Sequence, residues 1–353
     1  VYFLIGRYGG ARRNYAAVKF LLYSLFGGLL MLASLIGLYV VSADQLGTGT
    51  FDFTALAGLT IDPETQKWLF VGFFIAFAIK APLVPFHTWL PDAHTEAPTA
   101  GSMILAGVLL KLGAYGFLRL ILPLYPEEAR IFAGALAVLA TAAIVFGAFA
   151  SYAQTDFKRL VAYSSVNHMG FVVLGIAAAG LMAGTEDATI ALNGAILQMF
   201  NHGLSAAGMF FLVGVIYERT HTRNLKEFGG LFPLVPVYGG ILIFTSMASL
   251  GLPGLNGFIS EFLVVRGAWP ILPVYTAVAM LGLLFTGAYI LKGIKMVLHG
   301  PVNEHWAHGE HKLTEINTRE ILVMVPLMAL ILWIGIWPAW ILNVINKAVV
   351  SLF

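Results

Sequence analysis

Long apolar segments recur from one end of this sequence to the other, and they constrain its fold more than any other feature. A helix needs about 20 mostly apolar residues to cross the core of a bilayer, and on that measure the sequence predicts about nine complete spans. The expected spans are 15–42, 67–90, 98–122, 129–152, 158–182, 188–217, 232–268, 274–298 and 320–345. We therefore expect an all-α, polytopic membrane helix bundle.

The composition agrees with a lipid environment. Charged residues make up 11% of the chain and apolar residues 59%, whereas roughly a quarter of the residues of a soluble domain are charged. The sequence contains no cysteine, which excludes disulfides and iron–sulfur clusters held by thiolates in this chain. The net charge of +2 does not decide for or against an acidic partner. No basic and aromatic surface suited to nucleic acid is recognisable, so none is expected as a partner.

The first residues do not form a span of their own. Val1–Ile5 is apolar but too short to cross a bilayer, and it has no signal-peptide layout. We interpret it as the tail of a helix that begins upstream, and so expect an N-terminally truncated chain.

Basic residues recur on every second loop. The acidic loop residues between them are Asp44, Asp52, Asp62, Glu64, Glu186 and Asp187, and the basic ones are Arg7, Arg12, Arg13, Lys158, Arg159, Arg219, Arg223, Lys226, Lys312 and Arg319. The positive-inside rule places loops rich in lysine and arginine in the cytoplasm. It therefore predicts that 6–14, 91–97, 153–157, 218–231 and 299–319 are cytoplasmic and that the C-terminus faces out.

Prolines interrupt the expected span 67–90. Proline removes the hydrogen bond to the carbonyl four residues back, so Pro82 is expected to free the carbonyl of Ala78 and Pro85 that of Ala81. These carbonyls would lie on either side of Lys80. The sequence therefore predicts a broken helix with an ionisable residue at the break.

A second interruption, with Pro253 and Gly254, falls inside the run 232–268, which is too long for one straight span. Paired interruptions in corresponding positions indicate an inverted-repeat transporter. The alternative is that both are ordinary proline kinks, which membrane helices tolerate. We expect two inverted five-helix repeats, the first incomplete. The divisions would be 1–124 for the first repeat, 125–300 for the second, and 301–353 for a cytoplasmic loop and a C-terminal transmembrane helix.

Five ionisable residues fall deep within the expected spans: Lys80, Lys111, His168, His202 and Glu261. Charges at such depth are costly and usually face a bundle interior or a water-filled cavity. Burial disfavours the charged form of a side chain, and a group that gains and loses a proton readily suits a proton relay. We therefore predict that these residues carry protons. The alternative is that these residues have a purely structural role. This alternative carries more weight for the two histidines than for Lys80, Lys111 and Glu261.

Two other groups of ionisable residues leave their roles open. His87, Asp92, His94 and Glu96 are expected at the cytoplasmic mouth, where they could form a gate or simply a surface. The last cytoplasmic loop holds His299, Glu304, His305, His308, Glu310 and His311. Their spacing could suit a metal ion, but without cysteine or a fixed pattern we expect a solvated loop that binds no metal.

Several sequence blocks are specific enough to show a resemblance. They are 80–102, which contains the stretch from His94 to Ser102, together with 105–116, 156–170, 201–208 and 252–262. They closely resemble the proton-translocating antiporter-like family, and within it the M-type subunits of bacterial NADH:quinone oxidoreductase (respiratory complex I), the counterparts of mitochondrial subunit 4. The resemblance covers essentially the whole chain.

This resemblance implies a proton path of two half-channels joined by a buried polar axis. Lys80 matches the lysine of the family's first broken helix, Lys111 its central lysine, and Glu261 its terminal acidic group. Sister subunits usually have lysine at that last position, so Glu261 favours the M type. The family's glutamate that pairs with the first lysine would lie upstream of Val1.

The resemblance also implies where the chain works and with what. It would lie in the bacterial inner membrane beside other membrane subunits. No cofactor is expected in this chain, since NADH, FMN, iron–sulfur clusters and quinone would bind partner subunits. A multi-subunit cation/proton antiporter or a membrane-bound hydrogenase would share the fold and the lysines, but the stretch 94–102 and Glu261 favour the NADH enzyme. The deep ionisable residues argue against a membrane scaffold without transport.

The loop charges generate a prediction about topology. Reporter domains fused after Lys226 and after Phe353 are expected to lie in opposite compartments, the first in the cytoplasm. Compartment-specific reporter activity measures this. Activity in the same compartment for both fusions would contradict the number of spans.

Overall fold

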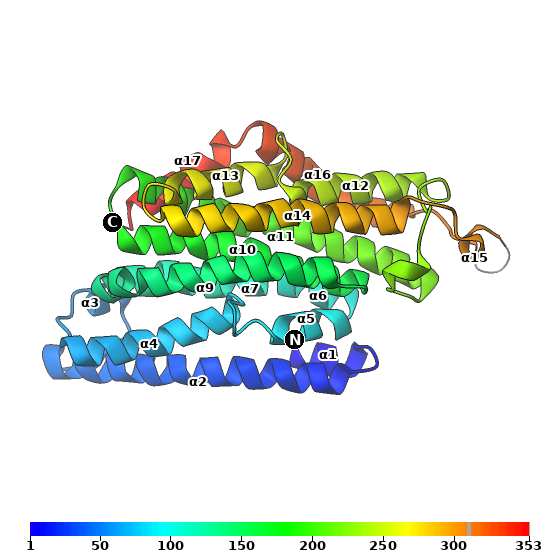
Figure 1. Cartoon of the computed structure of the whole chain (residues 1–353). Helices are drawn as coiled ribbons and strands as arrows, with labels where there is room; N and C mark the ends of the chain where they lie inside the picture. The colour runs from blue at the N-terminus through cyan, green and yellow to red at the C-terminus, as the bar shows by residue number, and fades with distance from the viewer. Residues whose placement is uncertain (309–311, 353) are drawn as a thin grey trace.

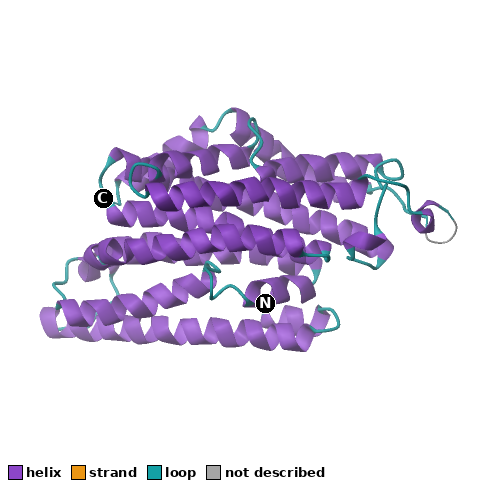
Figure 2. Cartoon of the chain, viewed as in Figure 1, coloured by secondary structure: helices purple, strands orange, loops and turns teal. Residues whose placement is uncertain are grey.

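Every regular element of the described chain is a helix, and most of the helices run side by side along one direction (Figures 1 and 2). The computed structural model describes residues 1–308 and 312–352. The elements are α1 Tyr2–Tyr8, α2 Arg13–Leu46, α3 Phe53–Ala57, α4 Pro63–Lys80, α5 Trp89–Glu96, α6 Thr99–Ile104, η1 Leu105–Leu109, α7 Leu110–Gly116, η2 Phe117–Ile121, α8 Leu122–Leu124, α9 Pro126–Ala153, α10 Phe157–Leu181, α11 Glu186–Thr220, η3 Leu225–Glu227, α12 Pro236–Leu250, α13 Asn256–Ala268, α14 Pro273–Leu298, α15 Glu304–Ala307, α16 Thr318–Ile336 and α17 Ala339–Val350. The all-α fold expected from the sequence is confirmed.

The expected spans match the observed helices closely. The described residues contain seven helical stretches long and apolar enough to cross a membrane: α2, Thr99–Leu124, α9, α10, α11, α14 and α16. The other two expected spans are each present as two shorter helices, α4 with α5 and α12 with α13. Both interruptions therefore lie where the prolines predict them.

The prediction that 320–345 forms a single helix is wrong. The structure has α16 up to Ile336 and then α17 from Ala339. Pro338 has no N–H to continue the ladder of helical hydrogen bonds. The chain therefore turns at Trp337–Pro338, and α17 packs on α11, where Asn193 donates to Asn346 over 2.8 Å.

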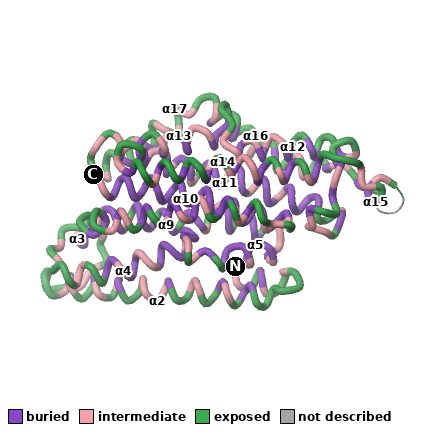
Figure 3. Tube along the Cα trace, in the orientation of Figure 1, coloured by how far each residue is buried: buried purple, intermediate pink, exposed green. Residues whose placement is uncertain are grey.

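Helix α10 forms the centre of the bundle. Nearly all of its residues are buried, and it packs against α9, α11, α13 and α14 (Figure 3). Helix α2 lies at the edge and exposes most of its length. Since exposed residues of α2 such as Leu22 and Phe26 are apolar, this face suits lipid or another apolar surface.

The five segments that the loop charges predict to be cytoplasmic lie at one end of the bundle (Figure 1). We call this end the basic end. The opposite end, which contains residues 43–66, is the acidic end. Contacts between these segments hold the basic end together: the Arg12 N–H donates to Glu96 (2.9 Å), Arg223 pairs with Asp156 (3.2 Å), and Asn303 donates to the backbone carbonyl of Glu227 (2.8 Å). That the basic end faces the cytoplasm stays a prediction.

The histidine-rich loop projects from the basic end (Figure 1). His308 pairs with Glu304 over 3.4 Å, and both side chains are exposed. No group of three or more potential metal ligands occurs among the described residues. Glu310 and His311, which belong to the same sequence cluster, lie outside those residues.

A glycine from a neighbouring helix lies against each break. A Cβ at Gly113 of α7 would lie 2.5 Å from the Ala81 nitrogen, directly after Lys80. A Cβ at Gly335 of α16 would lie 2.2 Å from the Gly254 carbonyl oxygen in the second break. Only glycine leaves room for backbone to approach backbone this closely.

Close packing of α9 on α10 generates a stability prediction. Replacing Gly147 with alanine is expected to destabilise the protein by about 1–3 kcal/mol, because the new Cβ would lie 2.7 Å from the Asn167 nitrogen. Thermal unfolding of the detergent-purified protein measures the change.

The matched control is Gly134→Ala on the same helix, where a Cβ would meet no atom within 4 Å. It is expected to be neutral or slightly stabilising, because alanine is the better helix former. Equal unfolding temperatures for the two variants would show that the α9–α10 contact is looser than described.

Candidate functional site

The first break repairs most of its own lost hydrogen bonds. The Leu83 N–H donates to the Ala78 carbonyl over 3.0 Å, so that carbonyl is not free as the sequence reasoning expects. The Trp89 indole N–H donates to the Ile79 carbonyl over 2.9 Å. An apolar medium makes an unpaired backbone group costly, which explains why both helix-end carbonyls find new donors.

Lys80 ends α4 at this break and is half-buried. Its ammonium lies 5.8 Å from the centre of the Phe20 ring of α2. A cation over an aromatic face is attracted by the ring. Among the described residues, the ammonium has no hydrogen bond or ion pair, so Lys80 is not directly bonded to the other deep ionisable groups.

Lys111 lies on α7 between two π-helical segments, η1 and η2. Its ammonium donates to the Ala106 carbonyl in η1, and it lies 2.7 Å from Nδ1 of His202. Only 8% of the residue is exposed. π-Helical turns often occur at functional sites, and here one supplies the carbonyl that holds the lysine.

Two histidines continue the polar line from Lys111. His202 Nε2 lies 3.1 Å from the Ser165 hydroxyl, and the rings of His202 and His168 have centroids 5.5 Å apart. His168 Nδ1 in turn lies 2.8 Å from a carboxylate oxygen of Glu261. Lys111, His202, His168 and Glu261 therefore form one buried series, which we call the polar axis.

Glu261 lies on α13, directly after the second break. Gly251 and Gly254 have φ of +80° and +94°, a conformation that only glycine adopts at little cost. A Cβ at Gly251 would lie 3.1 Å from the second carboxylate oxygen of Glu261. The carboxylate therefore lies over the turn that the break creates.

Sequence reasoning missed several polar partners of the axis. Gln198 donates to Glu261 (2.9 Å), Ser260 donates to Gln198 (2.5 Å), and the Tyr289 hydroxyl lies 3.3 Å from His168 Nε2. Helical spacing could have found Gln198, which precedes His202 by four residues, and also Ser165, the partner of His202, which precedes His168 by three. Tyr289 comes from α14 and has no such signal.

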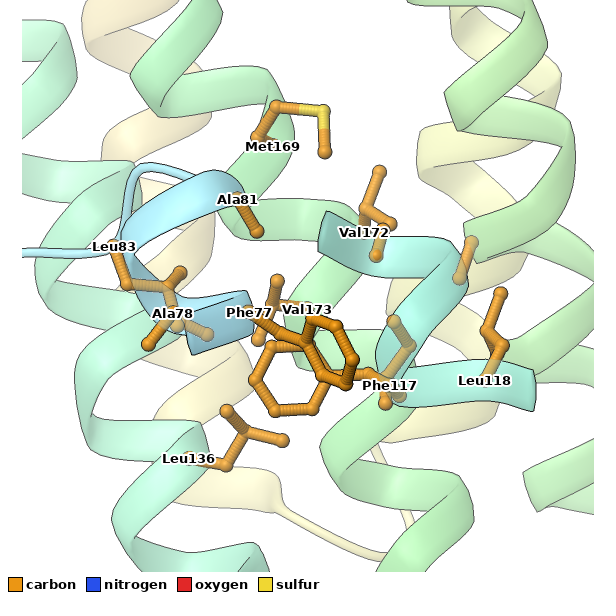
Figure 4. Close-up of a cluster of buried hydrophobic side chains, with 14 of the residues drawn as sticks. Phe77, Ala78, Ala81, Leu83, Phe117, Leu118, Leu136, Met169, Val172 and Val173 are labelled. Carbon is orange, nitrogen blue, oxygen red and sulfur yellow. The ribbon is translucent and has the colours of Figure 1, made fainter. Parts of the chain in front are cut away.

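An aromatic cluster lies between the two lysines and the acidic end of the bundle. Phe77, one turn before Lys80, packs on Phe117, with ring centroids 5.8 Å apart. Figure 4 shows both rings among apolar side chains that include Leu136, Val172 and Val173. Further rings of the cluster are Phe70, Phe73, Phe74, Tyr125 and Phe132. Among the rings of this aromatic cluster, only the phenol of Tyr125 can donate or accept a proton.

The residues at the expected cytoplasmic mouth divide into two sets. Asp92 pairs with Lys19 (2.7 Å) and Arg159 (3.6 Å), at the basic end. Glu96 also lies there and is half-buried. His87 and His94 are buried instead, so neither histidine is part of the surface.

The polar axis can pass protons but offers little else chemically. Its members are acids and bases at or near hydrogen-bond distance, which is the geometry that proton transfer requires. Lys80 is the one deep residue that the structure leaves apart from the axis. No other arrangement of nucleophile and base is evident among the described residues.

The sequence profile and the curated relatives indicate one family. The sequence profile described as NADH:quinone oxidoreductase/Mrp antiporter, transmembrane, matches residues 1–287. The chain is 42% identical to NADH-quinone oxidoreductase subunit M of Pseudomonas aeruginosa over 98% of its own length and 66% of that protein. The structure matches a chain of respiratory complex I from Thermus thermophilus with a TM-score of 0.86 and 31% identity, covering 99% of this chain and 72% of that one.

A more distant likeness concerns the fold alone. A chain of the Mrp complex from Dietzia matches with a TM-score of 0.78 at 19% identity, covering 99% of this chain and 71% of that chain. The chain spans about two thirds of the length of the curated relatives it matches, 66% for the Pseudomonas protein. With its apolar helices and bacterial relatives, it is a multi-pass protein of the bacterial inner membrane.

Proposed function

Because the chain belongs to the NADH:quinone oxidoreductase/Mrp antiporter transmembrane family, we propose that it carries protons across the membrane as the M-type subunit of an NADH:quinone oxidoreductase. Electron transfer in partner subunits supplies the free energy. The enzyme is a translocase as a whole, and this chain contributes the proton path and no redox centre.

The observation that supports this proposal most is the buried polar axis. A lysine, two histidines and a glutamate follow one another from α7 through α11 and α10 to α13, with neighbouring groups 2.7–2.8 Å apart at both ends of the series. Buried ionisable groups are costly, and a purely structural bundle gains nothing by lining up four of them. A series of this kind suits a proton that moves laterally between two half-channels.

Within this function the five deep residues have distinct roles. Lys111 and His202 exchange a proton across their hydrogen bond, and His168 passes it to Glu261. Lys80 lies at the first break and Glu261 at the second, so each break presents one proton-carrying group. In this proposal residues 1–124 supply the first half-channel and 125–300 the second, in the manner of inverted repeats.

Cofactors and partners follow from the same proposal. The chain has no cysteine and its described residues no metal-binding group; NADH, FMN, iron–sulfur clusters and quinone belong to partner subunits. The partners are other membrane subunits of the complex. Subunits of a multi-subunit cation/proton antiporter share the fold, but the match to a chain of the Mrp complex, at 19% identity, supports a shared fold and no shared function. Relatives at 42% identity bear the subunit M name.

The decisive experiment removes the central lysine. Replacing Lys111 with alanine in the full-length chain, assembled with its partners, is expected to lower NADH-driven proton pumping at least about tenfold, since positioned proton carriers contribute about 10²–10⁴-fold. Quinone reduction slows with it because the two are coupled. Acidification of inverted membrane vesicles measures pumping. Lys67→Ala, at the exposed end of α4, is the control; equal pumping by both variants would contradict the proposal.

A second substitution tests whether Lys80 releases its proton. Arginine keeps its charge at any physiological pH, so Lys80→Arg is expected to impair pumping although the positive charge remains. Lys67→Arg, on the same helix, controls for the larger side chain. Near-normal pumping by Lys80→Arg in the same vesicle assay would make Lys80 an electrostatic element and remove it from the list of carriers.

A further inference from the structure

His94 is held rigidly in the interior although its ring makes no polar contact. It is 0% exposed, and the Ser102 hydroxyl donates to its backbone carbonyl over 3.0 Å. Its ring stacks face to face on Phe210 of α11, with centroids 4.5 Å apart and planes 4° from parallel. Backbone and ring are therefore both fixed in place.

Neither ring nitrogen of His94 has a hydrogen-bond partner among the described residues. Buried polar atoms are nearly always paired, with protein or with water, and leaving one unpaired is costly. Phenylalanine would make the same ring stack without that cost. Packing alone therefore does not explain why this position holds a histidine with two unpaired ring nitrogens.

The ionisable neighbours of His94 lie on three helices and on two sides. On one side, Phe210, on which His94 stacks, lies about two helical turns along α11 from His202, which is bonded to Lys111 of α7. On the other side, Lys158 of α10 donates to the carbonyl of Ala97, directly after α5. Lys111 and His202 belong to the polar axis, whereas Lys158 lies towards the basic end. His94 thus lies between the polar axis and that end.

A cavity of about 570 Å³ opens at the basic end and reaches Lys158. Its wall includes Glu96, Glu218 and Arg223, so it is polar enough to hold water. Lys158 is 6% exposed and donates to the Ala97 carbonyl. The cavity therefore ends at a buried lysine that is bonded to the residue directly after α5, the helix that carries His94.

We propose that His94 delivers protons from this cavity to Lys111 by a route that does not pass through Lys80. One ring nitrogen takes a proton from the Lys158 side and the other releases one towards Lys111 or His202, in both cases through water, because neither nitrogen is within hydrogen-bond distance of a protein group. The imidazole is then neutral again and no electrons move. The aromatic cluster lies on the side of Lys111 towards the acidic end, and the other cavity that reaches Lys111 is lined almost wholly by apolar residues, so the basic end is the favoured source of the proton.

The position of Lys80 supports a separate route. Its ammonium has no hydrogen bond among the described residues and lies over the Phe20 ring, away from the polar axis. Lys80 packs on Gly113 of α7, and no hydrogen bond among the described residues joins the side chains of Lys80 and Lys111. This inference rests on the proposed function, because it concerns the supply of protons to the same axis.

The test compares His94→Phe, His94→Gln and Phe210→Leu in the full-length chain within the assembled complex. The first keeps the ring stack, the second keeps hydrogen bonding, and neither can carry a proton. Both are expected to lower NADH-driven pumping per assembled complex at least about tenfold. Phe210→Leu removes the stack but keeps the histidine, and is expected to retain most of the pumping.

A pH profile separates delivery of protons from a structural defect. If the supply of protons to Lys111 limits the His94→Phe variant, its remaining pumping rate is expected to rise in proportion to the proton concentration at the basic end. A defect in packing lowers the rate by the same factor at every pH. A pumping rate of His94→Phe that is lowered by the same factor at every pH would overturn the inference. Equal losses of pumping in His94→Phe and Phe210→Leu would also overturn it.

Lys111→Ala, measured in parallel, keeps the two proposals apart. If His94→Phe pumps normally while Lys111→Ala does not, the delivery route is wrong and the proposed function stands. If Lys111→Ala pumps normally, the proposed function itself fails.

Discussion

The bilayer core offers no water to an unpaired backbone group, and this constraint shapes both breaks in the bundle. A helix can stop at mid-depth only where other groups replace its lost partners. At the first break, Leu83 and Trp89 donate to the carbonyls of Ala78 and Ile79. At the second, the Leu252 N–H donates to the Met247 carbonyl over 3.1 Å. Each break is therefore a defined turn, and it holds its ionisable residue at a fixed position.

The same lack of water explains why the deep ionisable residues gather. A charge alone at this depth is costly, while a group bonded to another acid or base can share a proton with it. Lys111 with His202 and His168 with Glu261 form two such pairs, at 2.7 and 2.8 Å. The 5.5 Å between the two histidine rings is the longest step of the axis, and Ser165 stands beside it.

Much of the fold could be predicted because lipid imposes a simple rule on sequence. Span length gave the positions of the long apolar helices, and Pro82 and Pro253 gave the position of both breaks. The single span 320–345 was wrong because apolar composition alone does not reveal that Pro338 ends a helix.

The deep residues could be found from sequence, but their pairing could not. Pairing depends on how each helix is rotated about its axis, and the π-helical turns on either side of Lys111 alter that rotation. His94 illustrates the same limit: its sequence position near a loop suggested a surface or a gate, yet α5 carries it inside the bundle. The roles of all these residues stay predictions.

The contact of Gly335 with the second break has a mechanical consequence. Backbone lies directly on backbone there, with no side chain between α16 and Gly254–Leu255 to absorb a shift. A lateral displacement of α16 therefore pushes on the turn that positions α13. A partner protein that displaced α16 would therefore also displace the turn that lies under the carboxylate of Glu261. In the proposed function, a mechanical push on α16 would therefore reach the Glu261 end of the polar axis.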